Sequence, residues 1–163
     1  MHQAIEAHLG SRQVARVVYG TIIGMALVVA LEDHPPRSGV VAARLLATGL
    51  AVGLAEFYSE VVGLETRSRS GVGRAQLSHV LADVAAVGVG IAFPAIFFIL
   101  AAAGVLEVDA AFTVAKWSGL GLISMYGFVG GRLAGAGLAV SLLQAVAVGV
   151  IGGALIAFKA LIH

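Results

Sequence analysis

The sequence predicts an all-α integral membrane protein with five transmembrane helices, and three observations support this. The chain of 163 residues is 60% hydrophobic and only 12% charged, with a mean hydropathy of +1.00, which is far from the composition of a soluble domain. Its apolar runs are continuous and about 20 residues long, as a membrane-spanning helix requires, whereas barrel strands alternate over about ten residues. Its 22 glycines suit close helix packing in lipid.

Five apolar runs define the expected helices, at residues 14–31, 40–64, 77–105, 110–131 and 133–162, within a single membrane domain over residues 1–163. The first run follows a short lead-in, residues 1–13, that lacks the basic start and cleavage site of a signal peptide and is expected to be amphipathic. The second follows a connection that contains Pro35 and Pro36. The third follows the charged connection 65–76 and contains Pro94, which predicts a bend.

The connections before the last two helices are also short. Residues 106–109 are acidic and precede the fourth run, and residues 130–137, around the junction of the fourth and fifth runs, are rich in glycine. The chain therefore leaves no room for a folded soluble domain.

The charged residues predict the orientation of the helices. Basic residues gather at one set of helix ends and acidic residues at the other, with Arg37 and Lys159 as the main exceptions. The basic set is Arg12, Arg16, Arg67, Arg69, Arg74 and Arg132, and the acidic set is Glu32, Asp33, Glu107 and Asp109. The positive-inside rule places the N-terminus in the cytoplasm and the C-terminus outside. We expect a multi-pass protein of a prokaryotic plasma membrane.

Four polar side chains inside the second and third runs are the candidate functional residues. At about 1.5 Å per residue, Glu56 lies roughly 12 Å and Glu60 roughly 6 Å from the cytoplasmic end of the second helix. By the same measure, His79 lies roughly 3 Å and Asp83 roughly 9 Å inside the third helix. Each pair has i,i+4 spacing and so shares one helix face. Three carboxylates and an imidazole suit Fe²⁺ or Mn²⁺, or a proton relay.

Each of these residues also has a purely structural interpretation. Glu60 and His79 are close enough to the interface to extend into water. Glu56 and Asp83 are deeper, where an ion pair or a hydrogen bond to a neighbouring helix would explain them equally well. Lys116 and Arg44 are expected to extend outward, or else to neutralise a carboxylate during a transport cycle.

Other patterns exclude several functional classes. The absence of cysteine excludes disulfides and thiolate metal sites made by this chain. No nucleotide-binding loop, zinc-ligand spacing or nucleophile elbow is present, so we expect neither an enzyme nor a resident cofactor nor a nucleic-acid partner. Glycine pairs spaced by four residues predict tight helix contacts. They are Gly20 with Gly24, Gly49 with Gly53, and Gly149 with Gly153.

Several of these segments resemble the vacuolar iron transporter family. The run from Arg16 to Gly20, followed by Gly24, is similar to the family's first helix, and Leu54-Ala55-Glu56-Phe57-Tyr58-Ser59 is similar to its Gly-Glu-Tyr-x-Ser element. Phe93-Pro94 and the glycine-rich residues 127–153 are similar to its later helices. The resemblance implies a five-span homodimer that moves Fe²⁺ or Mn²⁺ out of the cytosol in exchange for protons, with Glu56 at the family's acidic position.

The chain departs from this family at three places. Ile23 stands where the family has an aspartate, and Val52 stands where it has a methionine. The long acidic domain that many members carry between spans two and three is reduced to residues 65–76. Anionic and soft ligands favour transition metals, so these changes remove two of the family's metal ligands.

The sequence leaves three functional hypotheses open. The first is a proton-coupled transporter of divalent metal that uses Glu56, Glu60, Asp83 and His79 as its site. The second is a membrane protein that does not transport, keeps the fold, pairs Glu56 within the bundle and serves as an interaction or assembly partner. The third is a transporter of another small solute or of protons alone, which would use the same carboxylates.

Overall fold

The computed structural model describes residues 12–68 and 71–162, and every regular element among them is an α-helix. The helices are α2 (Arg12–Leu31), α3 (Ser38–Ser68), α4 (Arg74–Ala92), α5 (Ala95–Ala102), α6 (Val108–Leu133) and α7 (Leu138–Ile162). The expected all-α class is therefore confirmed. Most of the expected lead-in, and also Arg69, lie outside the described residues.

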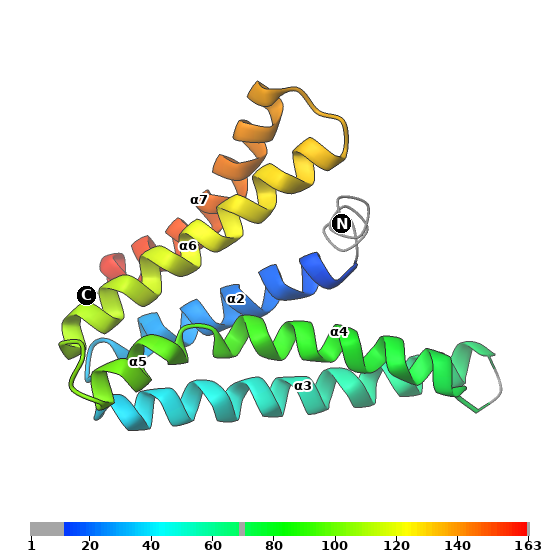
Figure 1. Cartoon of the computed structure of the whole chain (residues 1–163), viewed down its shortest axis with the longest axis horizontal. Coiled ribbons are helices and arrows are strands. Elements are labelled where there is room, and N and C mark those ends of the chain that lie inside the picture. The colour runs from blue at the N-terminus through cyan, green and yellow to red at the C-terminus, as the bar shows by residue number, and fades with distance from the viewer. Residues whose placement is uncertain (1–11, 69–70, 163) are drawn as a thin grey trace.

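The helices are stacked in layers (Figure 1). α3 lies beside α4 and α5, α2 packs mainly on α4, and the hairpin of α6 and α7 lies on the other side of α2. Taking α4 and α5 together, consecutive elements run in alternating directions, so that α2 and α4 point the same way. The α6–α7 hairpin diverges from the other helices toward its connecting turn.

Glycines let the backbones of α2 and α4 touch. A Cβ added at Gly20 would lie 2.2 Å from the carbonyl oxygen of Val87, and one added at Gly90 would lie 2.4 Å from that of Val17. At Gly24 the corresponding distance to the carbonyl oxygen of Ile91 is 2.7 Å. Only residues without a side chain allow this approach, because no real Cβ comes so close to a backbone oxygen.

The other predicted glycine pairs also lie at helix contacts, with one exception. A Cβ at Gly49 would lie 3.2 Å from the carbonyl oxygen of Gly88, and one at Gly149 would lie 2.7 Å from the Ser124 hydroxyl. Gly53 faces Val84, whereas Gly153 faces open space. The predicted tight packing is thus confirmed for most of these glycines.

A compact apolar cluster joins α2, α3, α5 and α6 at one end of the molecule. Its centre is an edge-to-face pair, Phe98 of α5 and Phe112 of α6, with ring centroids 4.7 Å apart. Val28 of α2 and Leu45 of α3 are fully buried against this pair. Dispersion contacts and aromatic geometry therefore hold four helices together at this end.

The expected third helix, 77–105, is wrong as a continuous element. It is interrupted at Phe93–Pro94 and divided into α4 and α5, and α5 ends at Ala102. Proline has no N–H and its ring collides with the carbonyl four residues earlier, here that of Gly90, so the helix is interrupted at the position of the predicted bend. Phe93 and Pro94 themselves keep right-handed helical backbone angles. The chain then leaves α5 through Gly104, whose φ of 77° favours glycine.

The expected start of the last helix at residue 133 is also wrong. α6 continues through Leu133, and α7 begins only at Leu138. Gly135 between them has a φ of 79°, and its N–H donates to the carbonyl of Arg132. This left-handed residue closes α6 and turns the chain.

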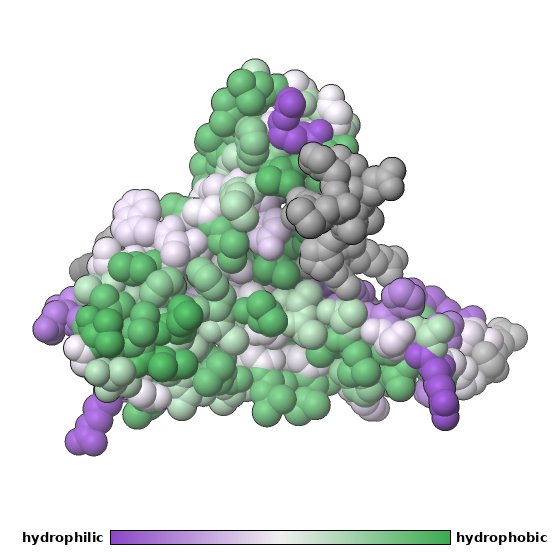
Figure 2. Space-filling model, viewed as in Figure 1, coloured by the Kyte–Doolittle hydropathy of each residue, from purple (hydrophilic) through white to green (hydrophobic). Residues whose placement is uncertain are grey.

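Three helices of the described chain are long and apolar enough to cross a membrane, namely Val14–Leu31, Ser38–Ser68 and Arg74–Ala92. α7 contains a shorter apolar stretch, Leu138–Ala154. α6 has 26 residues, but Asp109, Lys116 and Arg132 lower its hydropathy. Figure 2 shows apolar surface along the helices, with the hydrophilic residues concentrated toward their ends. These features are those of a membrane protein.

Candidate functional site: carboxylates paired with an arginine

Glu56 and Glu60 of α3 bind the same arginine. The Arg16 Nη1 atom of α2 donates to Glu56 Oε2 at 2.5 Å, and its Nη2 atom donates to Glu60 Oε1 at 2.6 Å. We call these three residues the Arg16 cluster. The predicted common face of the two glutamates is confirmed, since one guanidinium reaches both.

The neighbouring helix contacts explain why Arg16 arrives at this position. Gly20 holds α2 against α4 one turn further along the chain, and Gly53 of α3 is packed on Val84 of the same helix. α4 therefore brings α2 and α3 together near its middle. Glu56 lies about one turn beyond Gly53 in α3, and Arg16 about one turn before Gly20 in α2.

The Arg16 cluster is partly shielded from the surroundings. The side chains of Arg16, Glu56 and Glu60 are 22%, 21% and 28% exposed. Arginine presents its donors in a planar fork, so one side chain can serve two carboxylate groups at once. Two carboxylates and one guanidinium leave one negative charge, which makes the cluster attractive to a cation or a proton.

His79 and Asp83 do not join the Arg16 cluster. His79 is exposed at the surface of α4, and Asp83 is half-buried. Neither side chain makes an ion pair or a hydrogen bond with another described residue. The structure therefore brings together Glu56 and Glu60 but leaves the other two predicted residues apart.

The ligand set expected for a metal ion is not assembled in this conformation. Within residues 12–68 and 71–162 there is no group of three or more His, Cys, Asp or Glu side chains placed to hold a metal ion. The guanidinium of Arg16 occupies the space between the two carboxylates instead. Because both groups offer only oxygen donors, a hard or borderline divalent cation matches their chemistry once the arginine withdraws.

A second ion pair fastens the other end of α2. The Lys116 Nζ atom of α6 donates to Glu32 Oε1 at 2.5 Å, next to the end of α2. Lys116 was expected to extend outward or to neutralise a carboxylate, and in the structure it binds this acidic residue. Arg44, the other basic residue of this kind, is exposed on α3.

Sequence reasoning missed the role of Arg16, which it used only to orient the helices. A signal was present in the sequence: Arg16 lies two residues inside the first apolar run, at a depth of roughly 3 Å, and Glu60 lies at roughly 6 Å. Comparing the depths of opposite charges across spans one and two would have suggested the pair.

Comparison with protein-family models, characterised proteins and solved structures gives no match.

Proposed function

We propose that this chain is a multi-pass membrane transporter that moves a divalent cation, Fe²⁺ or Mn²⁺, out of the cytosol in exchange for protons. The Arg16 cluster is the observation that supports the proposal. It holds two carboxylates on one face of an apolar helix, both paired with one arginine of the neighbouring helix α2. Charged side chains at such positions are costly, and they typically mark ion or proton paths.

In the proposed transport step, Glu56 and Glu60 exchange Arg16 for a proton or a divalent cation. When Arg16 is bound, its positive charge neutralises one of the two negative charges of Glu56 and Glu60. When Arg16 withdraws, two adjacent carboxylates repel each other, and this repulsion is relieved by binding either a proton or a divalent cation. Asp83, half-buried on the helix that packs against both α2 and α3, would then add a third carboxylate.

The proposal includes five spans and a defined orientation. The alternating directions of α2, α3, α4 with α5, α6 and α7 (Figure 1) support five crossings. The basic residues at one set of helix ends support a cytoplasmic N-terminus and an outer C-terminus. We also propose that the protein acts as a homodimer in a prokaryotic plasma membrane.

Flux through proteoliposomes tests the transport proposal. Uptake of Fe²⁺ and Mn²⁺ is measured under an imposed pH gradient for the intact chain and for Glu56→Gln. Glu65→Gln is the matched control, because Glu65 is an exposed glutamate on the same helix. We expect saturable, proton-dependent flux that Glu56→Gln abolishes and Glu65→Gln preserves. Equal flux in Glu56→Gln and the intact chain would remove Glu56 from the mechanism.

A second candidate function is a membrane interaction or assembly protein that does not transport. The pairing of Glu56 within the bundle favours it, because this pairing is what a structural role for Glu56 requires. Under this hypothesis folded protein gives no flux above empty liposomes, and Glu56→Gln lowers thermal stability. A proton flux without metal, followed with a pH-sensitive dye inside the vesicles, would instead indicate the third hypothesis, transport of protons alone.

A further inference from the structure

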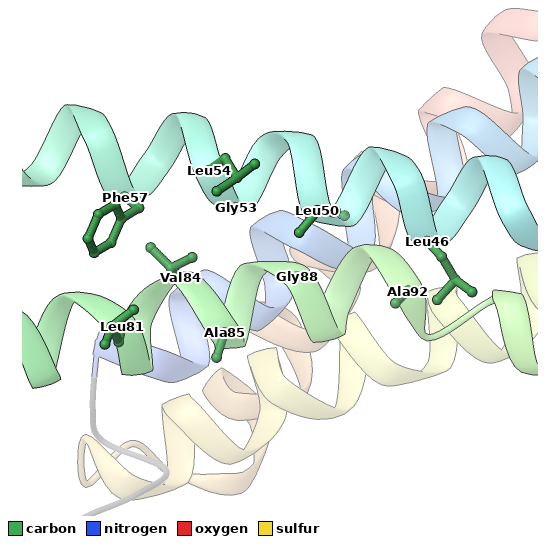
Figure 3. A pocket seen from close by; sticks show the side chains of 11 residues that line it. Leu46, Leu50, Gly53, Leu54, Phe57, Leu81, Val84, Ala85, Gly88 and Ala92 are labelled. Atoms are coloured by element: carbon green, nitrogen blue, oxygen red, sulfur yellow. The ribbon is translucent and has the colours of Figure 1, made fainter.

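An apolar groove runs along the outer side of the α3–α4 pair (Figure 3). It encloses about 470 Å³, within the range of about 300–1,000 Å³ that is typical of small-molecule sites. α2 lies behind the two helices in this view, so the groove is on the face opposite to α2. Every residue that lines it is glycine, alanine, valine, leucine or phenylalanine.

Small residues create the depth of the groove. Gly53 of α3 and Ala85 and Gly88 of α4 contribute no side chain beyond a methyl group, so the space between the helices stays unfilled. Leu50 and Leu54 form one wall and are 68% and 61% exposed. The groove is thus open along its side to whatever surrounds the helices, which in a membrane is hydrocarbon.

The groove is long enough for one acyl chain and lies across the middle of the predicted span 40–64. It extends over α3 from Leu46 to Phe57, which is eleven residue steps or about 17 Å at 1.5 Å per residue. The hydrocarbon core is about 30 Å thick, so the acyl chains of one leaflet fill about 15 Å. A single acyl chain therefore fits the groove lengthwise.

Two arginines lie beyond one end of the groove, on the helix faces that line it. Arg74 precedes Leu81 of α4 by seven residues and Gly88 by fourteen, and Arg67 follows Gly53 of α3 by fourteen. Positions seven apart on a helix differ by only about 20° in direction. Both arginines are exposed, and neither forms an ion pair with a described acidic residue.

We propose that this groove binds one acyl chain of an anionic phospholipid, whose phosphate is held by Arg67 and Arg74. The apolar lining accommodates the chain, the length suits one acyl chain, and the two exposed guanidinium groups match a negative headgroup. The proposal requires only that the helices lie in a membrane, so it is independent of the transport proposal.

Lipid titration of the full chain in detergent, followed by native mass spectrometry, tests the proposal. Delipidated protein is titrated with phosphatidylglycerol, which is anionic, and with phosphatidylcholine, which is zwitterionic. Ala85→Leu fills the groove, since Ala85 is exposed within it, and Ala139→Leu on α7 is the control for an added leucine. Arg74→Gln removes one guanidinium group, and Arg37→Gln at the opposite end is its control.

We expect the intact chain to bind phosphatidylglycerol more tightly than phosphatidylcholine. Ala85→Leu weakens the binding of both lipids, and Arg74→Gln weakens the anionic lipid roughly fivefold, as expected for one arginine near the membrane surface, and the zwitterionic lipid by less. Both controls bind as the intact chain does. Equal binding of the two lipids by the intact chain overturns the proposal, as does unchanged lipid binding by Ala85→Leu. A dimer that Ala85→Leu disrupts, with lipid binding unchanged, would assign the groove to a second copy of the chain.

A measurement on the intact sequence keeps the test decisive if Ala85→Leu does not fold. Phosphatidylglycerol that carries a photoreactive group on its acyl chain is cross-linked to the protein, and the adducts are mapped. We expect adducts within residues 46–57 and 81–92. Adducts confined to α6 or α7 would place the lipid elsewhere and refute the proposal.

Discussion

The Arg16 cluster makes a quantitative prediction about stability. Replacing Arg16 by Gln removes two charge-assisted hydrogen bonds, each of which contributes about 1.5–3 kcal/mol in proteins. The three side chains are 21–28% exposed, so these values are reduced by solvent screening. The two glutamates that remain repel each other by a further few tenths of a kcal/mol at i,i+4 spacing. We expect Arg16→Gln to lower the free energy of unfolding by about 2–4 kcal/mol.

Two further variants separate the geometry of this arginine from its charge. Arg16→Lys keeps the charge but presents a compact ammonium group instead of a fork, so it binds one carboxylate well and not both. Its cost should be about half of that of Arg16→Gln. Glu56→Gln leaves Arg16 with Glu60, so its cost should be smaller than that of removing the arginine.

A double-mutant cycle between Arg16 and Glu56 measures the interaction itself. Unfolding of the intact chain, Arg16→Gln, Glu56→Gln and the double variant is followed by circular dichroism in mixed micelles with increasing sodium dodecyl sulfate. We expect a coupling energy of about 1–2 kcal/mol. A coupling within about 0.5 kcal/mol of zero, which is the usual error of additivity, would refute the reasoning.

Two other predictions follow from the packing and the orientation. Gly20→Ala places a methyl group 2.2 Å from a backbone oxygen and should lower the free energy of unfolding by about 2 kcal/mol or more. Gly121→Ala faces open space and should be neutral or stabilising. Equal melting temperatures for the two variants would contradict the α2–α4 contact. Because the chain has no cysteine, Glu107→Cys should react with an impermeant maleimide on intact cells and Thr66→Cys only after lysis, and the reverse pattern would invert the proposed orientation.

Composition was sufficient to predict the all-α class and the approximate position of each helix. A helix that crosses a membrane needs a long apolar run and satisfies its backbone hydrogen bonds internally, whatever it packs against. Long apolar runs and short polar connections are therefore visible in the sequence alone. The errors occur where the backbone properties of a single residue determine where a helix ends. At Pro94 the missing N–H divides the third helix, and at Gly135 a left-handed residue turns the chain after α6.

The candidate site was predicted only in part. Sequence spacing shows which residues share a face of one helix, but it does not show which residues of two helices come close together. The i,i+4 rule is sufficient to place Glu56 and Glu60 on one face of α3. Which side chain meets them depends on the register between α2 and α3. This register is set where both helices pack on α4, through the contact of Gly20 with the Val87 carbonyl and of Gly53 with the Val84 side chain. A single sequence does not specify that register, and so Arg16 was overlooked as a partner.

The close contact of α2 with α4 also determines how far these helices can slide. Gly20 and Gly24 lie about one turn apart on α2, and a shift by one turn, about 5.4 Å, would bring one glycine into the position of the other. On the same face, however, the next positions are Arg16 and Val28. Arg16 is held by two glutamates and Val28 is fully buried. A slide in either direction would press one of these side chains against the backbone of α4, so α2 is blocked from slipping along its axis by one turn.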